Sequence, residues 1–225
     1  MELDRSDALC ERLRLLADLI ASSPHNLVSR RDRADVLGLH LEECAALAGM
    51  LPVKPGARWI DVGTGGGLPG LVLALCRPDT EWTLLDATRK KVEAVRSFAA
   101  ALGLRNVIAL HDRAERLAHQ DGMRGRFEGA VSRALGPLPV VMELCRGFVA
   151  PGGTIAAVRG PQWAAEVERA RPAARLLRIA DLHALPVPVA ARPTWVVTMR
   201  ADGPAPQGCP RPDGIPRTRP LDARA

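Results

Sequence analysis

Residues 59–70 read Trp59-Ile60-Asp61-Val62-Gly63-Thr64-Gly65-Gly66-Gly67-Leu68-Pro69-Gly70, and this stretch decides the fold. An apolar run ends at an acidic residue, and the glycines that follow let the backbone approach a ligand closely. Pro69 stands where a helix would begin, since a proline in the first turn loses no hydrogen bond. The pattern predicts a strand, a ligand-binding loop and a helix whose N-terminus faces the ligand.

A second apolar run ends at Asp86, about 20 residues on, where an acidic side chain can accept hydrogen bonds from ribose hydroxyls. The glycines themselves fit two ligand classes. Gly65, Gly67 and Gly70 satisfy the Gly-x-Gly-x-x-Gly pattern of dinucleotide sites. The form Asp-x-Gly-x-Gly-x-Gly over residues 61–67 favours S-adenosylmethionine, which has no pyrophosphate to cradle. The lack of any tyrosine removes the Tyr/Lys relay of the short-chain reductases, whereas a hydride enzyme that uses His and Arg stays open.

The length of 225 residues suits one α/β domain with small additions, because single cores run to about 250 residues. The formal net charge is +6, and of the 31 basic residues only Lys54, Lys90 and Lys91 are lysine. The planar guanidinium of arginine suits phosphates and guanine edges, so the charge permits a nucleic-acid partner. A GC-rich genome would give the same bias.

Five cysteines form no Cys-x-x-Cys pair, and no histidine stands at metal-ligand spacing from them, so we predict no metal site. The odd cysteine count and the charged first residues, which do not resemble a secretory signal, indicate a cytoplasmic protein. No apolar run reaches about 18 residues, so we predict no membrane-spanning segment.

Three regions follow one another along the chain. Residues 1–52 are predicted to form a helical extension, with one helix around Leu9–Ile20 and a second from Ala34 to Met50. Residues 53–200 alternate strand and helix, which predicts an α/β doubly wound, seven-stranded and mostly parallel sheet. Residues 201–225 are rich in proline and arginine, which predicts a basic tail without regular structure that suits a phosphate-contacting arm.

Within the core we place strands at 57–62, 81–86, 106–111, 127–132, 153–159, about 175–182 and 194–200, and helices at 68–76, 88–102, 137–149 and 161–172. Ligands in such sheets bind beyond the carboxyl ends of the strands. We therefore expect a single crevice surrounded by Gly63, Asp86, residues 112–115, Arg133 and Arg159.

Further motifs extend the pattern well beyond the glycine loop. They are Asn26-Leu27, His40, Lys90-Lys91-Val92, Leu102-Gly103-Leu104-Arg105-Asn106-Val107, Arg113-Ala114-Glu115, Val131-Ser132-Arg133-Ala134, Gly160, and the basic ending Gly214-Ile215-Pro216-Arg217-Thr218-Arg219-Pro220-Leu221. Together with the Gly-Leu-Pro-Gly that closes the loop, they make the chain resemble the bacterial 16S ribosomal RNA guanine-N7 methyltransferases of the RsmG, or GidB, family.

The resemblance implies a Rossmann-like class I methyltransferase that transfers a methyl group from S-adenosylmethionine to N7 of one guanine. The implied partner is 16S ribosomal RNA or the small ribosomal subunit, and we expect the chain to act as a monomer. The N7 lone pair is already nucleophilic, so catalysis can rest on positioning and electrostatics without a general base. The chain also lacks the Asp/Asn-Pro-Pro-Tyr/Phe element of amino-group methylases and the Pro-Cys nucleophile of pyrimidine methylases.

Loop and resemblance together assign two sets of site residues. The cofactor set is Asp61, Gly63, Gly65, Leu68, Asp86, Ala114, Glu115 and Arg133, and the substrate set is Asn26, His40, Arg159, Arg217 and Arg219. Arg133 could instead form a structural ion pair at the end of a strand or face the guanine. His40 could equally be a helix-packing histidine.

Three hypotheses of function remain open at this point. The first is the ribosomal RNA methyltransferase. The second is a methyltransferase that acts on another RNA or on a small molecule, and the third is an inactive RNA-binding protein on the same scaffold. If the tail is an RNA-binding arm, removal of residues from Gly208 onward should weaken RNA binding and spare cofactor affinity.

Overall fold

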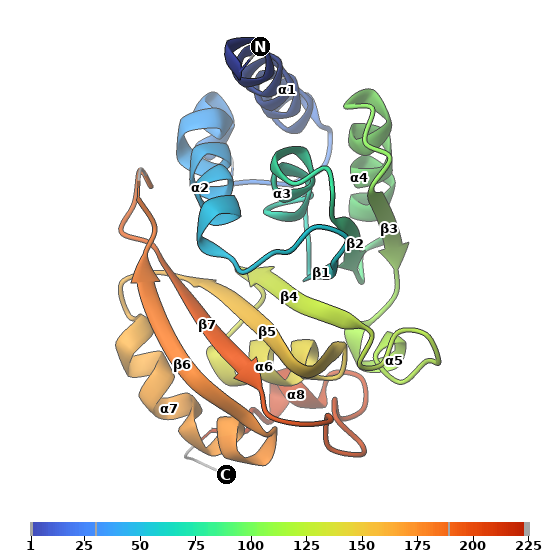
Figure 1. The fold of residues 1–225 in the computed structure, drawn as a ribbon, viewed down its shortest axis with the longest axis vertical. Coiled ribbons are helices and arrows are strands. Elements are labelled where there is room, and N and C mark those ends of the chain that lie inside the picture. The colour runs from blue at the N-terminus through green and yellow to red at the C-terminus, as the bar shows by residue number, and fades with distance from the viewer. Residues whose placement is uncertain (1, 30, 189, 223–225) are drawn as a thin grey trace.

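The computed structural model describes residues 2–29, 31–188 and 190–222 (Figure 1). Its strands are β1 (Arg58–Val62), β2 (Glu81–Asp86), β3 (Val107–His111), β4 (Phe127–Arg133), β5 (Val149–Arg159), β6 (Ile179–Pro186) and β7 (Trp195–Ala201). They form one sheet in the order β3-β2-β1-β4-β5-β7-β6. The first five strands are parallel, and β7 runs antiparallel to both of its neighbours. The predicted fold class is confirmed.

Helices cover both faces of the sheet. They are α1 (Glu2–Ser22), α2 (Glu42–Met50), α3 (Gly70–Cys76), α4 (Arg89–Ala101), α5 (Ala114–Leu117), α6 (Leu138–Arg146), α7 (Trp163–Leu176) and α8 (Ile215–Thr218). Helices α1 to α4 gather on one side, and α5 to α8 on the other (Figure 1). Each side has its own hydrophobic core, because alternate residues of a strand point to opposite faces.

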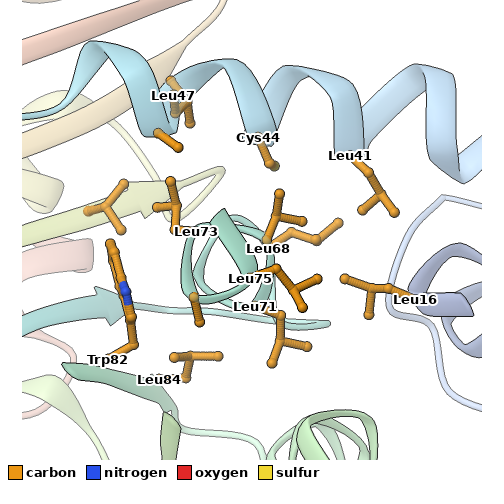
Figure 2. Close-up of a cluster of buried hydrophobic side chains, with 14 of the residues drawn as sticks. Leu16, Leu41, Cys44, Leu47, Leu68, Leu71, Leu73, Leu75, Trp82 and Leu84 are labelled. Atoms are coloured by element: carbon orange, nitrogen blue, oxygen red, sulfur yellow. The ribbon is translucent and has the colours of Figure 1, made fainter. Parts of the chain in front are cut away.

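Helix α3 is the centre of the first core. It is apolar on every side, as expected of a helix covered both by the sheet and by other helices. Figure 2 shows its leucines between Cys44 and Leu47 of α2 and Leu84 of β2, with Leu16 of α1 closing the cluster. The N-terminal helices therefore share a continuous core with the segment that follows the glycine loop.

Several predicted boundaries were wrong. The strand placed at about 175–182 is β6 at Ile179–Pro186, because α7 continues through Pro172 to Leu176. The predicted helix from Ala34 to Met50 consists of a 3-10 turn at Asp32–Asp35, a π-helical turn at Leu37–Leu41, and α2. Pro69 precedes α3 as its cap residue and does not lie inside its first turn.

The C-terminal region also differs from the prediction of a tail without regular structure. Residues 215–218 form one helical turn, α8, which contacts α6. Arg124 donates to the carbonyl oxygens of Cys209 and Pro206 at 2.6 and 2.8 Å, so the preceding segment is anchored as well. Residues 223–225 of the predicted tail lie outside the described residues. The division of the chain at residues 52 and 200 stays a prediction.

Within the described ranges, no helix is both long enough and apolar enough to cross a membrane.

Candidate functional site

A first pocket of about 480 Å³ opens at the carboxyl ends of four parallel strands. Gly63 follows β1, Asp86 ends β2, Asp112 follows β3 and Ala134 follows β4, and all four line it. Its volume falls within the range of about 300–1,000 Å³ that is typical of small-molecule sites. Most of the expected crevice is therefore confirmed as one cavity.

The glycine loop shapes the floor of this pocket. The backbone N–H groups of Gly63 and Thr64 both donate to the carbonyl oxygen of Leu85, at 2.8 and 2.9 Å, which ties the loop to β2. Gly63 has φ +76°, and a Cβ there would clash with Cδ1 of Leu135, which also lines the pocket. Only glycine combines this backbone conformation with the close approach.

Asp61 holds the loop from below and does not line either of the pockets that we describe. Its side chain is fully buried, and Oδ2 accepts hydrogen bonds from Thr64 Oγ1 at 2.7 Å and from Gly70 N at 2.9 Å. Oδ1 has no hydrogen-bond partner among the described residues. Burial raises the pKa of this carboxyl to about 6. Asp61 is thus an anchor of the loop, and its assignment to the cofactor stays a prediction.

Leu68 and Gly65, also assigned to the cofactor, support the pocket indirectly. Leu68 is buried in the first core beside α3 (Figure 2). Gly65 donates its backbone N–H to Asp86 Oδ2 at 2.9 Å, while Thr88 N donates to Oδ1 at 2.8 Å. Asp86 itself lines the pocket, so two backbone donors fix a carboxylate whose remaining lone pairs can accept further hydrogen bonds.

The far end of the pocket lies at α5. Ala114 and Glu115 line it, as predicted. Glu115 Oε1 accepts hydrogen bonds from Arg113 at 2.6 Å and from the backbone N–H of Gly214 at 3.1 Å. Burial, the largest single cause, raises the pKa of this carboxyl, but the hydrogen bonds from Arg113, Gly214 N and its own backbone N–H, together with the charge of Arg113, lower the pKa overall. Arg217 of α8 completes this end, although we assigned it to the RNA side.

A second pocket, of about 510 Å³, adjoins the first. Ala134 lines both cavities, while Arg133 and Arg159 line only the second. The prediction of a single crevice was therefore wrong for these two arginines. Arg133 leaves the last position of β4 on the face that carries α2, so it points away from the first pocket.

Arg133 belongs to a chain of buried polar contacts. Its guanidinium donates to Glu43 Oε1 at 3.1 Å and to Nδ1 of His40 at 2.8 Å. Nε2 of His40 lies 3.1 Å from Asp32 Oδ2, and Arg192 pairs with the other oxygen of Asp32. Since Nδ1 accepts from Arg133, we assign the proton to Nε2, which donates to Asp32.

His40 is therefore neutral. Burial, followed by the nearby positive charge of Arg133, lowers its pKa, and Asp32 opposes this only in part. The hydrogen bond from Arg192 is the main cause that lowers the pKa of Asp32. Arg133 and His40 fit both of the roles considered for them. Both residues make structural contacts, and both line the second pocket.

The remaining assigned residues have separate places. Arg159 lines the second pocket, donates to Gly136 O at 2.8 Å and pairs with Glu166. Asn26 and Arg219 are exposed and line neither pocket. Leu27, next to Asn26, packs closely on the glycine loop. A Cβ added at Gly66 would lie 2.8 Å from the Cβ of Leu27.

The sequence analysis missed the contribution of residues 192–194 to the second pocket. Arg192 and Thr194 line it, and Thr194 Oγ1 donates to Glu43 Oε2 at 3.0 Å. They precede β7, an antiparallel strand whose first residue pairs with Arg159 at the end of β5. An antiparallel last strand brings its amino end to the edge where the parallel strands finish, and that signal could have identified them.

Among the described residues, no group of three or more His, Cys, Asp or Glu side chains could hold a metal ion.

Comparisons with known proteins agree with the fold. Two solved structures share the fold: the S-adenosylmethionine-dependent methyltransferase SibL in its apo form (TM-score 0.61, 17% identity, 89% of this chain and 69% of that one) and the E81Q mutant of MtNAS in complex with S-adenosylmethionine (TM-score 0.59, 15% identity, 85% and 72%). At these identities the likeness concerns the fold alone.

Sequence relatives are closer. The proteins named ribosomal RNA small subunit methyltransferase G from Deinococcus deserti and Deinococcus radiodurans are 35% identical over 198 residues and 34% identical over 213 residues. The alignments cover 87% and 92% of this chain, and 81% and 83% of the relatives. The family model described as GidB, rRNA small subunit methyltransferase G, matches residues 10–190. The chain therefore belongs to the GidB family, as its motifs predicted.

Proposed function

We propose that this protein transfers a methyl group from S-adenosylmethionine to N7 of a guanine in 16S ribosomal RNA. The observation that carries the proposal is the meeting of two pockets at Ala134, one suited to a nucleoside cofactor and one lined by arginines. Membership of the GidB family supports the substrate, since its relatives are named ribosomal RNA small subunit methyltransferases.

The residues of the first pocket fit S-adenosylmethionine. A side chain at Gly63 would clash with Leu135, so the loop keeps open a cradle that a Cβ would fill. Asp86 would accept hydrogen bonds from the ribose hydroxyls, and its orientation is already fixed by Gly65 and Thr88. When bound, S-adenosylmethionine supplies a methyl group on a positively charged sulfur, ready for attack by a nucleophile.

The second pocket would hold the target nucleotide. Arg133, Arg159 and Arg192 line it, and each pairs with a carboxylate that fixes its orientation before any RNA arrives. A guanidinium has five N–H donors, so donors remain for phosphate oxygens or for O6 of guanine. Contacts of this kind make RNA binding weaken as salt concentration rises.

No residue has to remove a proton in this reaction, because N7 of guanine carries a free lone pair. The chain's task is to hold the base next to Ala134 and to exclude water from the junction of the pockets. Neutral His40 accepts a hydrogen bond from Arg133, so it helps to aim that guanidinium without adding positive charge. Rate enhancement then comes from positioning and fixed electrostatics.

Both pockets are built from one chain, so a monomer suffices for the proposed reaction. A ribosomal RNA substrate would place the protein in the cytoplasm.

The test is transfer of tritium from labelled S-adenosylmethionine to small subunits prepared from a strain that lacks this gene. Digestion and mass spectrometry then identify the labelled nucleotide, and we expect 7-methylguanosine at one position. The matched variant is Arg133→Ala, which removes a side chain that lines the second pocket and not the first. We expect it to lose transfer at low RNA concentration and to keep cofactor affinity, which also reports that the pocket is folded.

Other outcomes distinguish the alternatives. Cofactor binding without any transfer to subunits would move the assignment to another RNA or to a small molecule. RNA binding without cofactor binding would identify an inactive RNA-binding protein on a methyltransferase scaffold.

A further inference from the structure

The C-terminal strap, defined here as residues 209–219, is fixed to the core by buried ionic contacts. The Glu143 side chain on α6 is only 1% exposed, and it accepts three hydrogen bonds from Arg211. These come from the backbone N at 2.9 Å, from Nε at 2.8 Å and from a terminal guanidinium nitrogen at 2.7 Å. A buried carboxylate satisfied by a single arginine fixes the strap firmly.

A second anchor joins the strap to the edge of the first pocket. Gly214 N donates to Glu115, a residue that lines the pocket. Asp213 pairs with Arg113 at 3.6 Å and with Arg116 at 3.4 Å. The strap is therefore held directly against α5, which follows β3. Among the strands whose ends line the pocket, β3 lies farthest from β4 in the sheet.

Arg217 follows these two anchors and lines the first pocket. It is exposed, and the described part of the chain offers it no hydrogen-bond or ion-pair partner. The other arginine at this end, Arg113, is already paired with Glu115 and Asp213. Arg217 is thus a guanidinium brought to the wall of a ligand pocket with its donors and its planar face unused.

The junction of the pockets tells which part of the cofactor Arg217 would face, and this step rests on the proposed function. The reacting methyl group must lie at Ala134, where the substrate pocket begins, so the methyl end of the cofactor belongs beside β4. Asp86 on β2 would hold the ribose. The adenine must then lie farther along the sheet, beyond β2 at the end of β3, where residues 112–115 and Arg217 line the pocket.

We propose that Arg217 is a cofactor-binding residue whose guanidinium packs against the adenine of S-adenosylmethionine, and that the strap forms the outer wall of the cofactor pocket. Guanidinium groups stack favourably on aromatic rings. The family model ends at residue 190, so the strap lies outside the part of the chain that it matches. This role differs from the RNA-binding arm that the basic composition predicted.

Binding calorimetry on the full chain tests the proposal with two probes, S-adenosylhomocysteine and methylthioadenosine. Methylthioadenosine keeps the adenosine and lacks the amino-acid end. We expect Arg217→Ala to weaken both probes by about five- to tenfold, the size of a partly buried guanidinium–ring contact. The matched control is Arg219→Ala, which removes another exposed charge from the same strap and leaves the pocket lining intact. It should leave both affinities unchanged.

Three results would overturn the proposal. Equal losses in the two variants would mean that only the overall charge of the strap matters. A loss for S-adenosylhomocysteine alone would place Arg217 at the amino-acid end. Unchanged affinity in Arg217→Ala, with weaker RNA binding, would return the residue to the RNA side. Failure of the wild-type protein to bind either probe would count instead against the proposed function.

Discussion

Replacement of Asp61 by asparagine tests whether this residue anchors the glycine loop or contacts the cofactor directly. Asparagine keeps one acceptor oxygen, which can receive the hydrogen bonds that Thr64 and Gly70 give to Asp61 Oδ2. The substitution removes only the ionisable group and the buried Oδ1, which has no described partner. We therefore expect Asp61→Asn to bind S-adenosylmethionine with nearly unchanged affinity.

Asp61→Asn should also change how the free energy of unfolding depends on pH. The pKa of Asp61 is about 6 in the folded protein, against 3.8 for a free side chain. Between these values the folded protein binds more protons than the unfolded chain, so stability falls as the pH rises. One pKa unit corresponds to about 1.4 kcal/mol, so the ionised carboxylate costs about 3 kcal/mol above about pH 6. About 2 kcal/mol of this accrues between about pH 4.5 and pH 7.5.

Urea unfolding of both proteins at these two pH values measures the effect. Relative to the wild type, the free energy of unfolding of the variant should be about 2 kcal/mol higher at the higher pH than at the lower pH. Any constant cost of burying the new amide cancels in this difference, as do the contributions of other titrating groups. A pH-independent difference in stability would refute the argument from burial. Loss of cofactor affinity in a folded Asp61→Asn protein would show that the side chain contacts the ligand after all.

Three other substitutions test the structure. Gly63→Ala imposes a left-handed conformation on alanine and displaces Leu135, so it should cost about 1–2 kcal/mol of stability. It should also weaken S-adenosylmethionine binding, and an unchanged affinity by calorimetry would contradict the role of Gly63 in keeping the pocket open. Arg211→Ala strands the buried Glu143 carboxylate and should lower the free energy of unfolding by about 3 kcal/mol, measured in urea, whereas a change below about 1 kcal/mol would mean that the pair is solvated. NMR should show that His40 titrates with a pKa below 6.5. The unfolded chain then binds the proton more readily than the folded protein, so stability falls as the pH drops below 6.5, and His40→Gln should remove this dependence.

The sequence predicted the sheet and the first pocket because these features are local. Asp86 and Gly63 stand at the ends of strands that periodicity reveals, and topology then brings strand ends together. The loop anchors are harder to predict. Asp61 bonds to the loop and lies outside the lining of the first pocket, and a pattern of residue types does not show which way a side chain points.

Contacts between distant segments account for the rest. Nothing near Arg211 indicates that its partner lies 68 positions earlier at Glu143, so proline content suggested an unstructured tail. The second pocket likewise depends on Asp32 and Glu43, which the sequence analysis did not assign to the site. Pairing partners of this kind are set by the packing of whole elements, and one sequence does not encode them in any short pattern.

The second pocket takes its walls from four separated parts of the chain, the last of them at residues 192–194. Arg192 reaches Asp32 across 160 positions, and Thr194 reaches Glu43 across 151. Ribosomes build a chain from its N-terminus at about 5–20 residues per second, so an unfinished molecule has the glycine loop for some time before it can close this cavity. The second pocket, which we propose as the substrate site, is therefore completed only after residue 194 has been made, and a fragment that stops before Arg192 would keep the loop without the finished pocket.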